Sequence, residues 1–246
     1  MRRLILLGLA LVAASGCARS DASPSVPATP AHQYIVGIDL SASRTPTQLA
    51  DGRRLLEGLV STLAPGDRLV LIQTYQQQRD DAVRWETELP RVREPGHPTG
   101  GERRRIEQAR TAALAVVPAF FDASKSASIQ STDILQTLFR AADYAKARPR
   151  DSTVVLLLSD MLNSTAEMDM ERSGGIPGSA WIATRQAAGL LPDLRGVCVF
   201  AAGADVETRR GAAARAFWME YVRAAGGRMP ESAYRGLVTG RGEVGC

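Results

Sequence analysis

Three places in the sequence offer oxygen-bearing side chains with a spacing that could serve chemistry. Asp39, Ser41 and Ser43 follow one another at two-residue spacing, directly after the apolar run of residues 34–38. Thr132 precedes an amphipathic stretch, and Asp160 ends the apolar run of residues 152–159. Carboxylate and hydroxyl oxygens, without nitrogen or sulfur, are the ligands of hard cations such as Mg²⁺, Ca²⁺ or Mn²⁺. The residue types therefore predict a divalent cation site.

Each of the three groups also has a plain structural interpretation. Asp, Ser and Thr are frequent at turns between strands and helices, where they cap helix ends. Only their order along the chain, each at the boundary of an expected element, favours the cation site over simple capping. The choice between a cation site and simple capping therefore depends on the strands and helices that position these side chains.

Strands and helices alternate along the expected fold. Short apolar runs predict strands at 34–38, 68–75, 152–159 and 196–201, alternation predicts an edge strand at 82–89, and a short last strand is expected at 234–238. Apolar residues at helical spacing predict helices at 46–63, 102–121, 178–191 and 207–225, and one that begins with Ser131 or Thr132 as its cap. This pattern predicts an α/β fold, a doubly wound and mostly parallel sheet with helices on both faces. Such sheets bind ligands at the carboxyl ends of their strands, where Asp39, Ser41, Ser43 and Asp160 fall, and Thr132 stands at the start of a helix.

Composition bounds the class of protein. A chain of 246 residues fits one domain with a sizeable core. The formal net charge is +4, of which Arg2 and Arg3 supply two charges, which is too little to indicate a nucleic-acid partner. With only His32 and His97 and no Cys-x-x-Cys pair, a zinc site of the usual kind is not expected.

The first residues have the pattern of an export signal. Arg2 and Arg3 precede an apolar stretch at 4–12, and Ala14-Ser-Gly-Cys17 follows. This ending resembles the bacterial lipoprotein signal, in which the cysteine is acylated. We expect a signal peptide at 1–16, a lipidated Cys17 with a Pro/Ser/Ala-rich tether at 17–32, and a folded domain at 33–246. The alternative is an ordinary secretory signal that leaves a free thiol.

The location follows from this segment. A lipidated protein would be anchored to a membrane of the bacterial cell envelope. In a Gram-negative cell, Ala18 in place of an aspartate after the cysteine favours the periplasmic side of the outer membrane.

The cation-site residues resemble the von Willebrand factor A-type (VWA) domain and its metal-ion-dependent adhesion site. That motif has Asp-x-Ser-x-Ser after the first strand, a threonine in a later loop and an aspartate after the fourth strand. The matching residues here are Asp39, Ser41, Ser43, Thr132 and Asp160. The resemblance covers about residues 33–227. The sequence departs at Ser131 and Met161, where the family often has glycine.

The resemblance implies an adhesion protein and no enzyme. It implies that Mg²⁺, or Ca²⁺ or Mn²⁺, binds at the five residues and that an Asp or Glu carboxylate of a protein partner completes its coordination. One alternative is a VWA-like scaffold that works without metal. A less favoured one is Mg²⁺-dependent phosphoryl transfer with Asp39 as nucleophile, which commonly needs a second aspartate where Ser41 stands.

Two cysteines remain besides Cys17. An exported compartment permits a disulfide between Cys198 and Cys246. Cys198 lies in a predicted buried strand, where a cysteine is more often a small core residue. The sequence leaves both possibilities open.

Overall fold

A six-stranded sheet forms the centre of the molecule. The computed structural model describes residues 31–74, 84–94, 96–122, 131–172 and 174–246. The strands are β1 (His32–Ile38), β2 (Arg68–Gln73), β3 (Arg84–Glu88), β4 (Ser152–Leu158), β5 (Val197–Ala202) and β6 (Tyr234–Arg235). Their order across the sheet is β3-β2-β1-β4-β5-β6, and β3 alone pairs antiparallel with its neighbour. The predicted α/β fold, with its edge strand, is confirmed.

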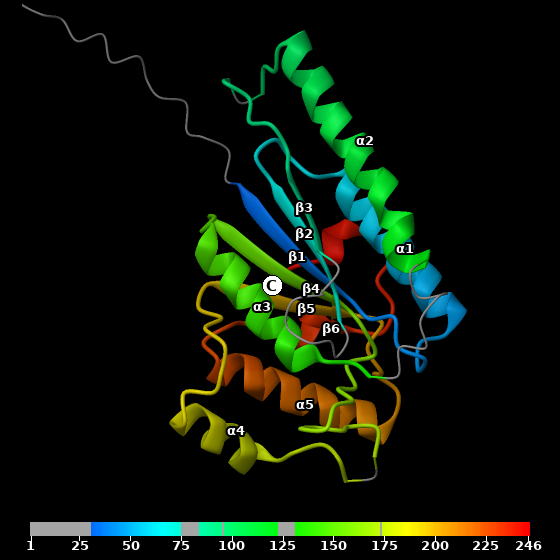
Figure 1. The fold of residues 1–246 in the computed structure, drawn as a ribbon, viewed down its shortest axis with the longest axis vertical. Helices are drawn as coiled ribbons and strands as arrows, with labels where there is room; N and C mark the ends of the chain where they lie inside the picture. The colour runs from blue at the N-terminus through cyan, green and yellow to red at the C-terminus, as the bar shows by residue number, and fades with distance from the viewer. Residues whose placement is uncertain (1–30, 75–83, 95, 123–130, 173) are drawn as a thin grey trace, which may run out of the picture.

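Helices cover both faces of this sheet (Figure 1). They are α1 (Pro46–Ser61), α2 (Gly100–Asp122), α3 (Ile134–Ala147), α4 (Ser179–Ala187) and α5 (Arg209–Ala224). The pair α1 and α2 lies on one side of the sheet, whereas α3, α4 and α5 lie on the other (Figure 1). The prediction of two helical layers is thereby confirmed, and the layout agrees with the Rossmann-like VWA fold that the resemblance implies.

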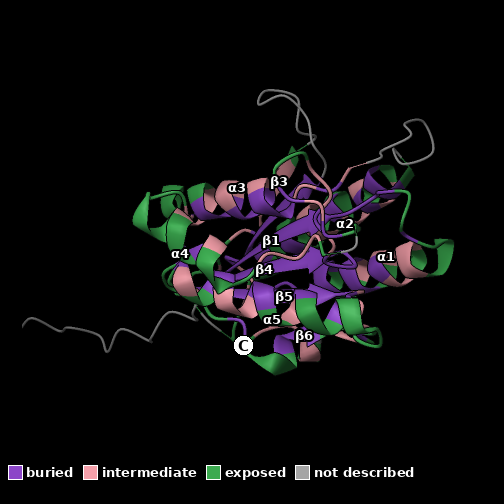
Figure 2. Ribbon diagram, turned by 90° about the horizontal axis from the view of Figure 1, so that it is seen from below, coloured by how far each residue is buried: buried purple, intermediate pink, exposed green. Residues whose placement is uncertain are grey.

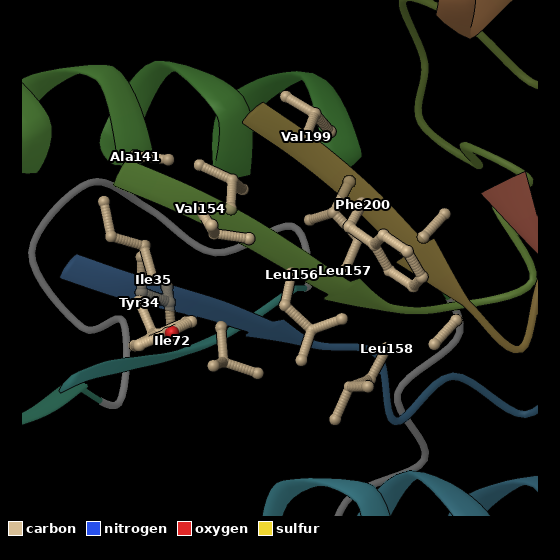
Figure 3. Close-up of a cluster of buried hydrophobic side chains, with 14 of the residues drawn as sticks. Tyr34, Ile35, Ile72, Ala141, Val154, Leu156, Leu157, Leu158, Val199 and Phe200 are labelled. Atoms are coloured by element: carbon tan, nitrogen blue, oxygen red, sulfur yellow. The ribbon is translucent and has the colours of Figure 1, made fainter. Parts of the chain in front are cut away.

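The core lies between the sheet and the helices on each face. Strands β2 and β5 are buried at every position and β1 and β4 at all but the first, whereas the helices expose their outer faces (Figure 2). Alternate residues of neighbouring strands send their side chains to opposite faces (Figure 3). This burial on two faces explains why the strands have continuous apolar sequences instead of alternating ones.

One glycine in β1 lets a helix approach the sheet closely. A Cβ atom added at Gly37 would lie 2.9 Å from both Leu157 Cδ2 and Thr137 Cγ2. Thr137 belongs to α3, so the absence of a side chain at Gly37 sets the spacing between this helix and the sheet. That spacing matters because the loop before α3 carries Thr132.

The cap of α3 differs from the prediction. Asp133 is the N-cap residue, and its side chain accepts a hydrogen bond from the backbone N–H of Gln136 at 2.9 Å. Ser131 and Thr132 therefore precede the cap, and the prediction that one of them caps the helix is wrong. The hydroxyl of Thr132 is consequently free of this role.

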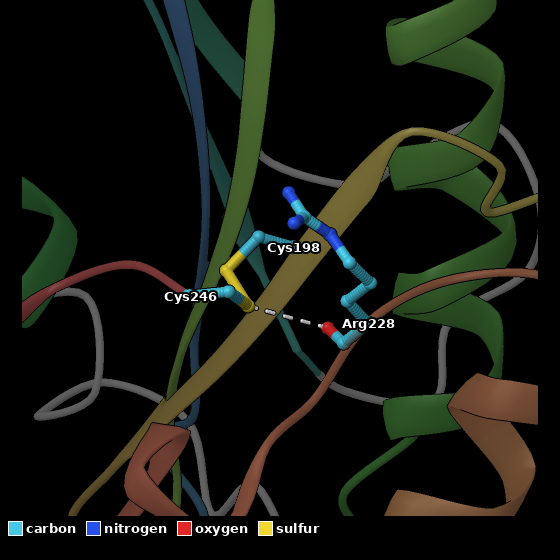
Figure 4. The surroundings of a disulfide bond; sticks show 3 residues. All are labelled: Cys198, Arg228 and Cys246. Atoms are coloured by element: carbon cyan, nitrogen blue, oxygen red, sulfur yellow. Dashed lines mark hydrogen bonds between the residues drawn. A yellow bond between two sulfur atoms is a disulfide. The ribbon is translucent and has the colours of Figure 1, made fainter.

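A disulfide joins Cys198 of β5 to Cys246, with their Cα atoms 5.7 Å apart (Figure 4). The structure thus selects the paired form of the two cysteines. Cys198 is in register with Val154, which pairs in turn with Tyr34, so the bond lies near the amino ends of the strands. The described chain also enters β1 at this edge of the sheet.

Within the described residues, no helix is both long and apolar enough to cross a membrane. Cys17 and the predicted signal peptide and tether up to residue 30 lie outside these residues.

Candidate metal centre

Two loops at the carboxyl edge of the sheet continue the hydrogen bonding of the strands before they diverge. The backbone N–H of Asp39, after β1, donates to the carbonyl of Leu158 at 3.0 Å. The N–H of Ser159, after β4, donates to the carbonyl of Ala202 at 3.1 Å. The backbones of both loops are therefore fixed by the sheet at the point where their acidic side chains begin.

All five residues predicted for the site come together at this edge. The Oγ atoms of Ser41 and Ser43 are 3.0 Å apart, and Ser43 Oγ donates to Asp160 Oδ2 at 2.8 Å. Thr132 Oγ1 donates to Asp39 Oδ1 at 3.1 Å. Three loops far apart in sequence thus contribute to one hydrogen-bonded cluster of oxygens.

The cluster is buried on the sheet side and open on the other. Asp39 is 1% exposed and Thr132 fully buried, whereas Ser43 is exposed. Ser43 is therefore the exposed member of the cluster.

Thr132 is held in place from the loop that follows Asp160. The backbone N–H of Ser164 donates to the carbonyl of Thr132 at 2.8 Å. The buried side chain of Asn163 accepts from the N–H groups of Ile134 and Leu135, at 2.8 and 3.3 Å, at the start of α3. Asn163 is thus a positioning residue that ties the loop after β4 to the loop before α3.

The residue after Asp160 keeps the backbone conformation that favours glycine. Met161 has φ 68°, the single positive value among the non-glycine residues described, and its side chain is fully buried. Trp218 Nε1 donates to the Met161 carbonyl at 2.8 Å. The sequence departs from the family pattern here, yet the backbone adopts the left-handed turn that a glycine would permit.

Sequence reasoning missed a further hydroxyl in contact with Asp39. Ser159 Oγ donates to Asp39 Oδ2 at 2.7 Å and accepts from the N–H of Met161 at 3.0 Å. The backbone N–H of Ser41 donates to Asp39 Oδ1 at 3.0 Å. Both oxygens of Asp39 therefore have partners, which fixes the plane of its carboxylate. Only the strand register, which the sequence does not state, brings Ser159 there.

Two ionised carboxylates are unfavourable in this buried site, because neither water nor a neighbouring positive charge balances them fully. Burial, and then the charge of Asp160, raise the pKa of Asp39, although hydrogen bonds from Ser159 and Ser41 lower it in part. The carboxyl group of Glu171 is affected by the same two aspartates. Its pKa is raised by its partial burial and by the charges of Asp160, Asp169 and Asp39. A positive charge placed between these groups would therefore be stabilised.

One buried cation already lies near the site in the chain, and sequence reasoning did not find it. Arg44 follows Ser43 and is 6% exposed. Burial lowers its pKa, whereas the charges of Asp39 and Asp160 raise it. An arginine at the start of a helix would ordinarily extend into solvent, so its burial depends on the surrounding fold.

The residues present fit a hard divalent cation by their chemistry. They offer two carboxylates and three hydroxyls, all oxygens, at an edge open to solvent. Within the described ranges, no group of three or more His, Cys, Asp and Glu side chains lies together in a way that could hold a metal ion. The candidate site contains two such side chains and reaches five ligands only through its hydroxyls.

Comparisons with known proteins give a distant likeness in shape alone. No protein-family model and no curated protein matches the sequence. Among solved structures, an aerotolerance-related membrane protein from Bacteroides fragilis NCTC 9343, with multiple mutations to serine, is 16% identical. The match covers 80% of this chain and 89% of that one, with a TM-score of 0.43.

Two further structures are similar over most of this chain. The human COPII-coat protein Sec24c is 13% identical over 85% of this chain and 29% of its own, with a TM-score of 0.39. Proximal thread matrix protein 1 from the mussel byssus is 12% identical over 84% of this chain and 41% of its own, with a TM-score of 0.37. This chain spans less than half the length of either protein. Such low identities and TM-scores carry no conclusion about family or function.

Proposed function

We propose that this protein is an adhesion protein of the bacterial envelope, which binds a divalent cation and, through it, a protein partner. The observation that carries the proposal is the cluster of Asp39, Ser41, Ser43, Thr132 and Asp160, linked by hydrogen bonds and open at Ser43. An oxygen-only cluster of this kind suits Mg²⁺, or Ca²⁺ or Mn²⁺. In this proposal the protein binds without turning over a substrate.

The bound cation would supply a Lewis-acidic position for an Asp or Glu carboxylate of the partner. The chain's own residues would hold the ion. Asp39 is oriented by Ser159 and Ser41, and Asp160 by the N–H of Leu162, which donates to its Oδ1 at 3.0 Å. Ser43 marks the exposed side from which the partner would approach.

The location is part of the same proposal. The lipoprotein-like signal ending in Cys17 supports a lipid anchor in the envelope membrane. The segment 17–32, rich in Ala, Ser and Pro after the lipidated Cys17, would then tether the domain to the anchor. An acylated cysteine usually carries several chains, which together bind a membrane stably.

A thermal unfolding experiment tests the cation site. After treatment with EDTA, added Mg²⁺ or Mn²⁺ should raise Tm increasingly with concentration, because the ion binds the folded form alone. Asp160→Asn should abolish the increase. Asp193→Asn is the matched control, because Asp193 is exposed and pairs with Arg195 at the amino edge of the sheet. An unchanged Tm at millimolar metal would reject the site.

Capture from an envelope extract tests the partner. The wild-type protein should retain a partner with Mg²⁺ present and release it in EDTA, and Asp160→Asn should retain nothing specific under either condition. Equal retention by both proteins in EDTA would instead favour a metal-free scaffold, for which the buried charge of Arg44, the residue after Ser43, is the supporting observation.

A further inference from the structure

The amino edge of the sheet, opposite the candidate metal centre, carries an excess of positive charge. Three segments there lead from the end of a helix into the next parallel strand: residues 146–151 before β4, 188–196 before β5 and 223–228 before β6. Their acidic residues are Asp151 and Asp193. Their basic residues are Lys146, Arg148, Arg150, Arg195, Arg223 and Arg228. All of these basic residues except the half-buried Arg150 are exposed, so the excess charge is in contact with water.

The three segments form one continuous surface. A Cβ atom added at Gly226 would lie 2.8 Å from Cγ of Arg195, so the segments before β5 and β6 touch. On its other side, the segment before β5 and the end of α3 enclose an open hollow of about 420 Å³. Lys146, Arg150, Asp193 and Arg195 all line this hollow. Cations from three parts of the chain are thereby gathered at one edge.

The aspartate in the hollow is already compensated, whereas two nearby cations are not. Asp193 accepts hydrogen bonds from Nε and Nη2 of Arg195 at 2.7 and 2.6 Å. Within the part of the chain that the structure describes, Lys146 and Arg148 form no ion pair. These two side chains can therefore bind an anion from outside without breaking a contact inside the protein.

An apolar side chain on the same edge favours a bilayer over a free anion. Leu190 belongs to the same segment as Arg195 and is 51% exposed. Its backbone N–H donates to the carbonyl of Arg185 at 2.8 Å, which fixes the turn that presents it. Cations together with exposed apolar side chains bind the interface of an anionic membrane, where both contribute. A free anion would make no use of the leucine.

The chain also enters the domain at this edge. The N–H of Ala31 donates to Asp151 Oδ2, and the N–H of His32 to Asp67 Oδ1, both at 2.9 Å. Strands β1 and β4 begin side by side there (Figure 1). A lipid anchor at Cys17 would therefore be joined to the domain at its basic edge.

We propose that the amino edge of the sheet binds anionic phospholipid headgroups, so that the domain rests on the envelope membrane with the candidate metal centre facing away from it. Lys146 and Arg148 contact phosphate groups, the hollow between α3 and β5 accommodates one headgroup, and Leu190 enters the interface. The choice of a bilayer rests on the proposed lipid anchor. The affinity of this edge for anions depends on neither the anchor nor a bound metal.

Vesicle binding of the full chain with Cys17→Ser tests the proposal, because this variant cannot be acylated. Partition coefficients are measured in EDTA on vesicles of equimolar phosphatidylglycerol and phosphatidylcholine, and on vesicles of phosphatidylcholine alone. Their ratio reports the preference for anionic lipid, and any contribution of residues 1–16 to it is the same in every variant. The ratio should favour the anionic vesicles strongly and fall as salt is added.

Two double variants locate the binding surface. Lys146→Gln with Arg148→Gln should lower the ratio at least about tenfold, because each cation near an anionic surface contributes about fivefold to binding. Arg209→Gln with Arg210→Gln is the matched control, since it removes two exposed charges at the start of α5, near the carboxyl edge. The control should change the ratio little. Equal losses in both double variants would mean that net charge alone acts and would overturn the proposal, as would equal binding of the parent chain to both kinds of vesicle.

A substitution of the opposite sign tests the hollow. Asp193→Asn should raise the ratio, because it releases Arg195 from its ion pair and adds a positive charge beside Lys146. Glu207→Gln, which makes the same change in charge at an exposed position after β5, should not raise it. An unchanged ratio in Asp193→Asn would overturn the assignment of a headgroup to the hollow.

Inorganic phosphate separates a bilayer from a free anion as the occupant. At equal ionic strength, phosphate and chloride should release the protein from anionic vesicles to the same extent, and stronger release by phosphate would overturn the bilayer. None of these measurements contains a divalent cation or a protein partner. Their failure would leave the proposed cation site standing, and a Tm that does not respond to Mg²⁺ would leave the lipid-binding edge standing.

Discussion

At the scale of single residues, Met161 carries backbone strain next to the candidate ligand Asp160. A non-glycine residue in the left-handed region costs about 1–2 kcal/mol. Met161 tolerates this cost because its side chain is fully buried and its carbonyl accepts a hydrogen bond from Trp218. Packing on both sides of the residue thus fixes a turn that its own conformational preference opposes.

We predict that Met161→Gly is more stable than Met161→Ala by about 1 kcal/mol. Both variants lose the buried side chain, but only glycine relieves the positive φ. The order is the reverse of that found at ordinary helix or strand positions, where glycine is the less stable residue. Urea unfolding of the two variants, compared through their midpoints, measures the difference. An alanine variant at least as stable as the glycine variant would contradict the strained turn.

Residue-scale prediction from the sequence succeeded where the signal was local. The Asp-x-Ser-x-Ser spacing and an aspartate directly after an apolar run pointed to four of the five side chains that the structure brings together, and the family resemblance added Thr132. Ser159 and Arg44 escaped notice because their roles depend on neighbours far away in the chain. Ser159 meets Asp39 across 120 positions, and Arg44 meets Gly203 across 159.

At the scale of elements, the first turn of α2 is anchored by one carboxylate. Glu102 accepts hydrogen bonds from the backbone N–H and the hydroxyl of Thr99, both at 2.8 Å, and from the N–H of Arg93 at 3.1 Å. These bonds, those of Thr99 foremost, lower the pKa of Glu102 to about 2. The negative charge also lies at the helix end where the macrodipole favours it.

We predict that Glu102→Gln lowers stability at neutral pH and that the loss fades in acid. Because the folded-state pKa is depressed from 4.5 to about 2, the ionised carboxylate stabilises the fold above 4.5, and this contribution is lost as pH falls through about 2. Denaturant unfolding of the wild type and the variant across this range gives the difference. Thr99→Val, which removes one donor, should make the pH-dependent difference smaller. A difference that does not change with pH would mean that the charge plays no part.

Elements themselves were readable from sequence, but their ends were less so. Continuous apolar runs and helical spacing are local signals that burial on one or two faces imposes. The cap of α3 was assigned to Ser131 or Thr132, whereas Asp133 caps the helix. The choice among three adjacent capping residues depends on where Asn163 and Ser164 hold the preceding loop. That contact comes from a different part of the chain.

At the scale of the whole molecule, the bond between Cys198 and Cys246 closes a long loop. The two residues are separated by 48 positions. In the chain-entropy account, a loop of this length stabilises the fold by about 4 kcal/mol, because the unfolded chain loses freedom. The closed loop includes all of α5 and β6, so the bond constrains the part of the chain that follows β4 in the sheet, from β5 to the last residue.

We predict that reduction lowers the free energy of unfolding by several kcal/mol, up to about 4. Cys246→Ala should give a similar loss under oxidising conditions, and it should no longer respond to reductant. Urea unfolding with and without dithiothreitol measures both effects, and mass spectrometry reports the pairing. If reductant leaves the wild-type midpoint unchanged, the disulfide is absent or contributes nothing.

The pairing of the cysteines could not be decided from the sequence. A cysteine inside a buried strand has the same local pattern whether it packs or pairs. What decides between them is the return of the final residues to the amino end of β5, which is a property of the complete fold. Strand order across the sheet also depends on the complete fold. The alternation of strands and helices predicted only that the sheet is mostly parallel.

The start of β1 and the disulfide of Cys246 both lie at the amino edge of the sheet, whereas Asp39 and Asp160 lie at the carboxyl edge. This polarity has a practical value for measurement. A biosensor surface or a fluorescent label attached before Ala31 would be separated from the site by the length of the central strands. Immobilised in that way, every molecule would present the same edge to a flowing analyte, so binding with and without metal could be compared on one chip.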